Sequence, residues 1–163
     1  MADLDPAIKA LAEQIGRAED LDGAAGVLDQ MLAAAPEDFQ LLQLAGAAAF
    51  RRGDFAAAKI TAARLLETLK KLPDPLARVS FQARSAVILD HAAEVSQAAD
   101  ILKKTETFAR QSLGGTNLGV ALRHVANAFA ETEQLTQAMT ILDDVTENSN
   151  RTPVLITAAP KQA

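Results

Sequence analysis

The chain of 163 residues contains no cysteine, tryptophan or tyrosine, and its aromatic residues make up only 4% of the sequence. Without cysteine, the fold cannot contain a disulfide, a catalytic thiolate, or a zinc or iron–sulfur site with cysteine ligands. Stretches rich in β-branched and aromatic residues hardly occur, which argues against a sheet. These absences favour a helical protein.

The chain also lacks the segments that are typical of secretion or membrane insertion. Its first ten residues, MADLDPAIKA, contain neither a basic region nor an apolar one, so they do not resemble a signal peptide. No uninterrupted apolar run reaches the roughly 18 residues that a membrane-spanning helix needs. The net charge of −5 favours solubility and argues against a general nucleic-acid or anionic-membrane binder. We therefore expect a cytoplasmic protein without membrane insertion.

Alanine is the most prominent residue that is present, with 35 copies. Alanine favours helix, and its small side chain lets helix axes approach closely. Apolar residues recur at steps of three and four along most of the chain, which is the period of an amphipathic helix. The sequence predicts an all-α protein that is long enough for one domain with a sizeable core.

The segment RRGDFAAAKI, residues 51–60, predicts a corner between two helices. Gly53 can adopt the left-handed conformation that ends a helix. Asp54 can cap the next helix, and we expect Phe55 to fill the angle between the two. Ala58 follows one turn later, where a larger side chain would clash.

The same corner occurs four times. Its four forms are EDLDGA, GDFAAA, AEVSQA and EQLTQA, which end at Ala24, Ala58, Ala98 and Ala138. Each alanine follows an apolar residue by three positions, and these residues are Leu21, Phe55, Val95 and Leu135. The alanines are 34, 40 and 40 residues apart. Such regular spacing predicts an array of repeats.

With these corners and an ordered set of small and large apolar positions, the chain resembles the tetratricopeptide repeat (TPR) family. The positions that carry the resemblance include Leu11, Ala12, Pro36, Leu42, Gly46, Leu66, Leu122, Ala126, Phe129 and Leu142. The units are approximately 5–38, 39–72, 73–118 and 119–152, with a tail at 153–163, and the third is divergent and lengthened. The resemblance implies a single domain over 1–163, an all-α solenoid of about four helix–turn–helix hairpins in a right-handed superhelix.

The third unit departs most from the repeat pattern. Asp74 and Pro75 predict the start of a helix over about 75–91, and a second helix follows over about 95–113. The segment LGGTNLG, 113–119, predicts a flexible linker. A phosphate-binding loop is disfavoured there, because the Lys-Ser/Thr of a Walker motif and the preceding strand of a dinucleotide fold are missing.

The sequence does not indicate catalysis. A metal site at His91 or His124 would need further ligands nearby; Asp90 and Glu94 flank His91, but a solvated helix end is the simpler interpretation. No histidine pairs with a serine or cysteine nucleophile in any familiar pattern. We predict that the protein is not an enzyme and has no cofactor and no metal.

Charge is distributed unevenly. Residues 39–72 carry six basic and two acidic side chains, a net charge of +4, and residues 1–38 carry two basic and nine acidic ones, a net charge of −7. We interpret Phe50 and Phe55 as core residues rather than as stacking partners for bases, so nucleic acid is not an expected partner. The charge difference can steer a charged partner or promote head-to-tail self-association.

The resemblance implies that the first helix of each hairpin lines a concave groove for peptides. The groove candidates carried over in this way are Lys9, Glu13, Arg17, Gln40, Gln43, Phe50, Arg51, Arg123, Asn127 and Glu131, together with Val87, Asp90 and His91 from the divergent unit. Lys9 stands at a position of the family's carboxylate clamp, but Glu13 replaces the asparagine that should follow. This departure disfavours EEVD-type tails as ligands. For each residue an ordinary solvated face remains the alternative.

These observations favour a non-catalytic protein–protein interaction module. It would act as an adaptor, scaffold or chaperone that binds a peptide or protein partner, of partly acidic character, in the groove. The alternatives are a dedicated bacterial secretion-type chaperone and a self-assembling structural subunit. In the last case a homo-oligomer would form through the C-terminal end, whose segment TPVLITAAP is apolar.

Overall fold

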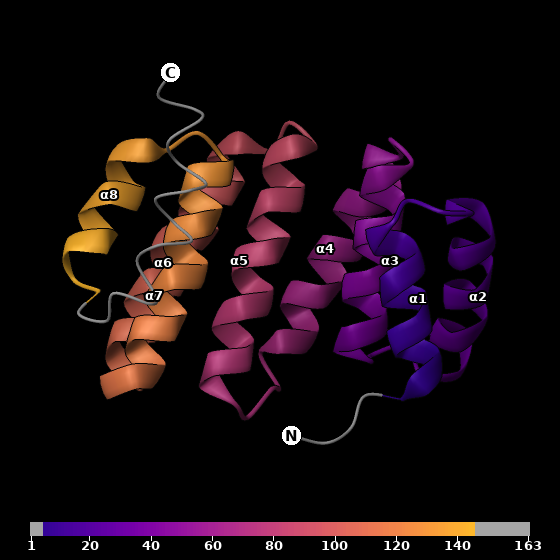
Figure 1. Cartoon of the computed structure of the whole chain (residues 1–163), viewed down its shortest axis with the longest axis horizontal. Helices are drawn as coiled ribbons and strands as arrows, with labels where there is room; N and C mark the ends of the chain where they lie inside the picture. Colours follow the sequence, from indigo (N-terminus) through magenta and orange to yellow (C-terminus); the bar gives the residue numbers. More distant parts are fainter. Residues whose placement is uncertain (1–4, 146–163) are drawn as a thin grey trace. The chain divides into compact units, whose positions relative to one another are not determined.

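The computed structural model describes residues 5–145, which form eight helices and no strand (Figure 1). The chain divides into two compact units: unit 1 ends at Leu69 and unit 2 begins at Lys70. The all-α class predicted from the sequence is confirmed. The single domain, the repeat units and the solenoid arrangement stay predictions, and the tail at 153–163 lies outside the described residues.

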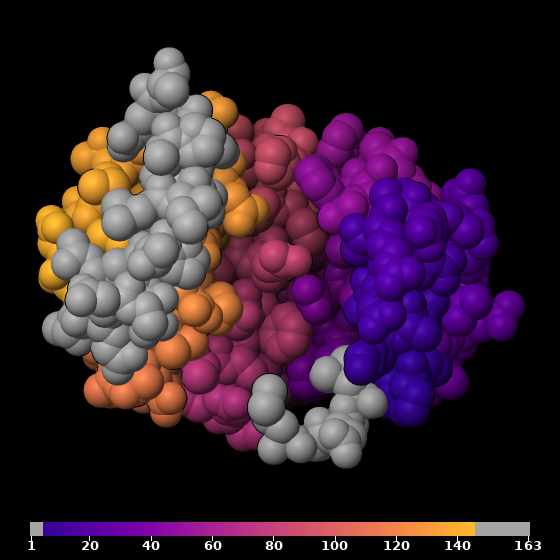
Figure 2. All heavy atoms as spheres, viewed as in Figure 1, coloured from indigo at the N-terminus to yellow at the C-terminus, as the bar shows by residue number. Residues whose placement is uncertain are grey.

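Unit 1 contains two helical hairpins. Its helices are α1 (Pro6–Gly16), α2 (Leu21–Ala34), α3 (Phe39–Arg51) and α4 (Phe55–Leu69). Helix α3 packs against the other three, and Leu28, Leu42 and Leu65 are fully buried among them. The indigo side chains around α1 form part of the surface of this unit on the side shown in Figure 2.

Unit 2 also contains two hairpins, formed by α5 (Pro75–His91), α6 (Val95–Ser112), α7 (Gly115–Glu131) and α8 (Leu135–Asp143). Helix α7 packs against α5, α6 and α8. Helices α5, α6 and α7 have 17, 18 and 17 residues, whereas the helices of unit 1 have 11 to 15. The six extra residues of each 40-residue period therefore lengthen helices, as the sequence predicted.

All four hairpin corners use one backbone motif. In each, a residue in the left-handed conformation follows the first helix; these residues are Ala18, Gly53, Ala93 and Glu133, with φ of 56°, 76°, 66° and 62°. At the second corner the Gly53 N–H donates to the Phe50 carbonyl (3.0 Å), and the Asp54 N–H donates to the Ala49 carbonyl (2.9 Å). The other three corners repeat both bonds at the same offsets. This pattern is the Schellman motif, which satisfies the last carbonyls of a helix.

The small residue after each corner is buried, as the sequence predicted. Ala24 is 1% exposed, and Ala58, Ala98 and Ala138 are fully buried. The first corner contains one residue more than the others, because Asp20, at φ 39°, separates the end of the motif from α2.

The prediction that Phe55 fills the corner is wrong. Its side chain is 46% exposed, and its ring makes an edge-to-face contact with Phe50 of α3, with 5.9 Å between ring centroids. As the first residue of α4, Phe55 lies at the rim, while Ala58 occupies the closest approach one turn later. The interpretation of Phe55 as a core residue is wrong for the same reason.

The predicted linker at 113–119 is also wrong. Only Leu113 and Gly114 separate α6 from α7, which begins at Gly115. Gly119 lies inside α7 and is buried. It is therefore part of a regular helix and not of a linker.

Aspartate caps the first five helices. Asp5, Asp20, Asp38, Asp54 and Asp74 each accept a hydrogen bond from a backbone N–H two or three residues later, at 2.8 to 3.4 Å. The predicted cap at Asp74 and first helical residue at Pro75 are confirmed. Helices α6, α7 and α8 have no such side-chain cap.

Candidate functional site

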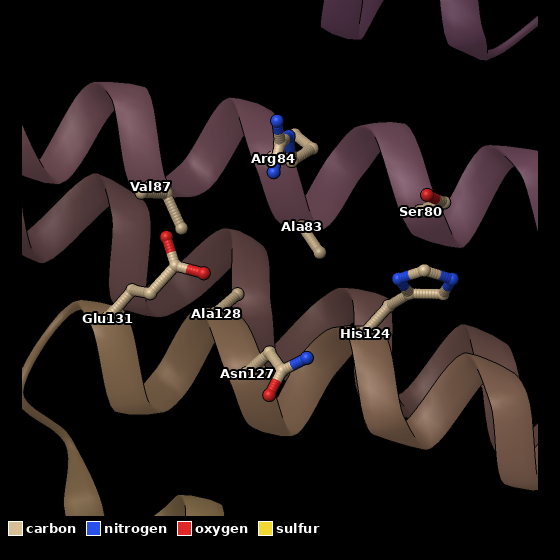
Figure 3. Close-up of a pocket in the computed structure, with 8 residues that line it drawn as sticks. All are labelled: Ser80, Ala83, Arg84, Val87, His124, Asn127, Ala128 and Glu131. Atoms are coloured by element: carbon tan, nitrogen blue, oxygen red, sulfur yellow. The ribbon is translucent and has the colours of Figure 1, made fainter. Parts of the chain in front are cut away.

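Helices α5 and α7, the first helices of the two hairpins of unit 2, run in the same direction side by side (Figure 3). Each turns one stripe of residues at helical spacing toward the other. The stripe on α5 is Ser80, Ala83, Arg84 and Val87, and the stripe on α7 is His124, Asn127, Ala128 and Glu131. Together these eight residues line a hollow of about 70 Å³.

Two alanines set the depth of this hollow. Ala83 and Ala128 are each 3% exposed and face one another across the seam in Figure 3. Because neither side chain extends beyond Cβ, the longer polar side chains at the neighbouring positions stand around an open space. Its volume accommodates a few waters or a small polar group.

Four of the polar side chains around the hollow are unusual because they have no partner among the described residues. No side-chain hydrogen bond or ion pair joins any of residues 5–145 to the side chains of Ser80, Arg84, His124 and Asn127. The Asn127 Oδ1 atom is buried and has no hydrogen-bond partner among the described residues. A buried carbonyl oxygen without a partner costs about 1–3 kcal/mol. A group that donates a hydrogen bond to this oxygen is therefore favoured.

Both basic and acidic side chains border the hollow. His124 reaches from α7 toward Ser80 and Ala83, near Arg84, and Glu131 lies at the other end beside Val87 (Figure 3). Burial lowers the pKa of His124, and the positive charges of Arg123 and Arg84 lower it further. At neutral pH the imidazole is therefore uncharged and can both donate and accept a hydrogen bond.

Three of the predicted groove residues, Val87, Asn127 and Glu131, line this hollow. A fourth, Arg123, acts on His124 through its charge. Two more lie near the end of α5, where Asp90 is half-buried and His91 is exposed.

The remaining candidates lie in unit 1, on its first helices α1 and α3. Lys9, Glu13 and Arg17 are exposed at successive turns of α1, and Arg17 pairs with Glu13 at 3.9 Å. On α3, Gln40, Gln43 and Phe50 are half-buried, and Arg51 is exposed. The groove role of all of these residues stays a prediction.

Sequence reasoning missed Ser80 and Arg84 and considered His124 only as a metal ligand. Each residue of the α5 stripe precedes its counterpart on α7 by 44 residues, as in Ser80 and His124, whereas the corner alanines of these hairpins are 40 residues apart, so the corner spacing did not predict this register. The repeat pattern of the family has a shorter period, so the resemblance did not bring these residues together either. Within residues 5–145, no group of three or more histidine, aspartate or glutamate side chains is arranged to hold a metal ion.

Comparison of the chain with protein-family models, with curated proteins and with solved structures finds no match. The TPR resemblance therefore depends on the residues of this chain alone. Among the described helices, none is both long and apolar enough to cross a membrane.

Proposed function

We propose that this chain is a non-catalytic protein-interaction module, a TPR-like helical repeat array whose first helices bind an acidic segment of a protein partner. The observation that carries the proposal is the hollow between α5 and α7, where Ser80, His124 and Asn127 have no side-chain partner among residues 5–145 and two arginines lie nearby. A repeat array offers such a surface along its length, because each hairpin presents the same helix face.

Charge supports the acidic character of the partner. Arg84 and Arg123 lie beside the hollow in unit 2, and neither forms an ion pair with a described residue. In unit 1, Arg51 is exposed at the end of α3. Unpaired cations on a surface attract acidic partners and raise the rate of association. An adaptor, a scaffold and a chaperone all use this kind of surface, and a cytoplasmic location remains a prediction.

Capture of partners from the source cell, followed by charge reversal, tests the proposal. A captured protein should bind the R51E/R123E double variant about 1–3 kcal/mol more weakly than it binds the parent chain, because two charge-assisted contacts are replaced by repulsion. Lys103→Glu is the matched control, since Lys103 is exposed on α6, a second helix. Equal loss in the control, or no loss in the double variant, would contradict the proposed groove, provided that the circular dichroism of all variants agrees.

Self-association is a second candidate function. Large apolar side chains are exposed on the second helices of the hairpins, namely Val27, Phe55, Ile60, Val95 and Met139. Exposed apolar groups mark contact surfaces when they gather into a patch. Sedimentation over a range of concentrations tests this candidate, because a structural subunit gains mass with concentration and an adaptor does not.

A further inference from the structure

His124 lies in the contact between α5 and α7 and faces Ser80 of the neighbouring helix (Figure 3). Its imidazole is half-buried there. Arg84 on α5 and Arg123 on α7 are the residues whose charges act on the ring, and both are positive. The carboxylate that borders the same hollow, Glu131, lies about two turns further along α7. The contact therefore accommodates a neutral imidazole and opposes a protonated one.

The contact between the two helices is weakly held around the hollow. Ala83 and Ala128 face one another across it and are each 3% exposed, but alanine side chains bury little apolar area. The Asn127 Oδ1 atom is buried in the closed contact without a hydrogen-bond partner among residues 5–145. Separation of the helices gives this oxygen water as a partner and removes that cost. A change in charge at one residue can therefore shift the balance between closed and separated helices.

We propose that the contact between α5 and α7 is acid-sensitive, and that a proton on His124 separates the hairpin of α5 and α6 from the hairpin of α7 and α8. Arg84 is exposed and can turn away from the ring, but its movement does not return water to a half-buried imidazolium. Separation of the helices does so, and it also moves Arg84 away from the new charge. The hairpins remain joined through Leu113 and Gly114. The inference concerns the fold of unit 2 and does not depend on the proposed interaction function.

The direction of the pH dependence follows from the two states of the ring. Burial, and then the charges of Arg123 and Arg84, hold the pKa of His124 below its ordinary value of 6.5 while the helices are in contact. After separation the ring is hydrated and its pKa returns toward that value, so the separated form binds the proton more tightly. The contact is fully stable above about pH 6.5 and weakens as the pH falls from there toward the lowered pKa. The equilibrium shifts tenfold for each pH unit between the two pKa values.

The charged groups of the other helices that pack against α7 do not account for this response. Helix α7 also contacts α6 and α8, but the hollow is lined by α5 and α7 alone. The charges of α6 and α8 are not among those that act on His124; they belong to Asp100, Lys103, Lys104, Glu106, Arg110 and Asp143. Carboxyl groups ordinarily titrate around pH 4, below the range in which His124 acts.

The distance between the two hairpins tests the inference directly. Because the chain has no cysteine, the substitutions Thr107→Cys on α6 and Thr140→Cys on α8, both at exposed positions, provide two unique sites for spin labels. Their separation is measured by electron paramagnetic resonance at about pH 7.5 and about pH 5.5, above and below the ordinary pKa of histidine. We expect a longer and broader separation at the lower pH, and no change when His124→Gln is added. His91→Gln, at the exposed end of α5, is the matched control and should respond as the parent chain does.

Arg84→Gln provides a second variant at an exposed position, which decides the question if His124→Gln does not fold. Titration by nuclear magnetic resonance should give His124 a higher pKa in this variant than in the parent chain, and the change in label separation should be smaller. The inference would be overturned by an unchanged separation in the parent chain, by an equal response in His124→Gln or Arg84→Gln, or by loss of the response in His91→Gln. Loss of the helical circular dichroism signal together with the increase in separation would also overturn it, because general unfolding would then be the cause.

Discussion

The hairpin corners of the two units share one backbone motif but differ in the residues that form it. In unit 1 both corners have an aspartate cap, at Asp20 and Asp54, and one has glycine at the left-handed position. In unit 2 the left-handed residues are Ala93 and Glu133, and no side chain caps α6 or α8. The same geometry therefore forms with and without the residues that favour it locally.

The difference indicates that packing, rather than local preference, determines the corners of unit 2. A non-glycine residue in the left-handed region costs roughly 1–2 kcal/mol, and the missing cap costs a similar amount. The buried alanine one turn into the second helix is the feature that both units keep. At the corner between α5 and α6, its burial between helices of 17 and 18 residues offsets the unfavourable corner residues.

Overpacking the shared alanine tests whether the two units depend on it equally. Ala58→Leu and Ala98→Leu each place three extra carbon atoms at a fully buried position. Each should lower the free energy of unfolding by about 1–3 kcal/mol, because the surrounding helices must separate to admit the side chain. Urea denaturation measures the change.

The control for this comparison is Ala56→Leu, at an exposed position of α4 in the same corner segment. It should leave the midpoint nearly unchanged. An unaltered midpoint in Ala58→Leu or Ala98→Leu would show that the corner is not the point of closest approach.

The sequence predicted the corners because their requirements are local. A small residue at a fixed distance from a turn is visible in the chain, and Asp74 followed by Pro75 defines the start of α5. The exposure of Phe55 was not predictable, since an apolar residue at the rim and one in the core look alike in sequence. The position of Gly119 was not predictable for a similar reason, because a buried glycine inside a helix and a glycine in a linker look alike in sequence.

The candidate site was predicted less well than the fold. The family resemblance identified Val87, Asn127 and Glu131 as groove residues. It did not assign Arg84 and His124 to the groove. Their roles depend on α5 and α7 lying in parallel at a particular register, which brings together residues 44 positions apart. Neither a short motif nor the charge pattern contains that register.

Exchanging the cap residues between units should produce the next largest effect. Glu94→Asp shortens the side chain at the start of α6 to the length that caps α4, and should raise the free energy of unfolding by about 0.5–2 kcal/mol. Asp54→Glu should lower it by a similar amount, because the bond from the Ala57 N–H at 3.0 Å is lost. Thermal denaturation of the two variants measures both changes in stability. If both variants, or neither of them, were more stable than the parent chain, the caps would not account for the difference between the corners.

Exchange of glycine and alanine at the left-handed position should have the smallest effect. Ala93→Gly relieves a backbone strain of roughly 1–2 kcal/mol at φ 66°, but the added freedom of the unfolded chain removes about 0.4–1 kcal/mol of that gain. We therefore expect a net stabilisation between a few tenths and about 1 kcal/mol, and an opposite change of similar size in Gly53→Ala, where φ is 76°. The exposed Gly26 of α2 supplies the control, because Gly26→Ala replaces a residue inside a regular helix and should stabilise through helix preference alone. Urea midpoints of the three variants distinguish the two causes. Destabilisation by Ala93→Gly would show that the left-handed alanine is held without strain, so that the corners of unit 2 would need no compensation from packing.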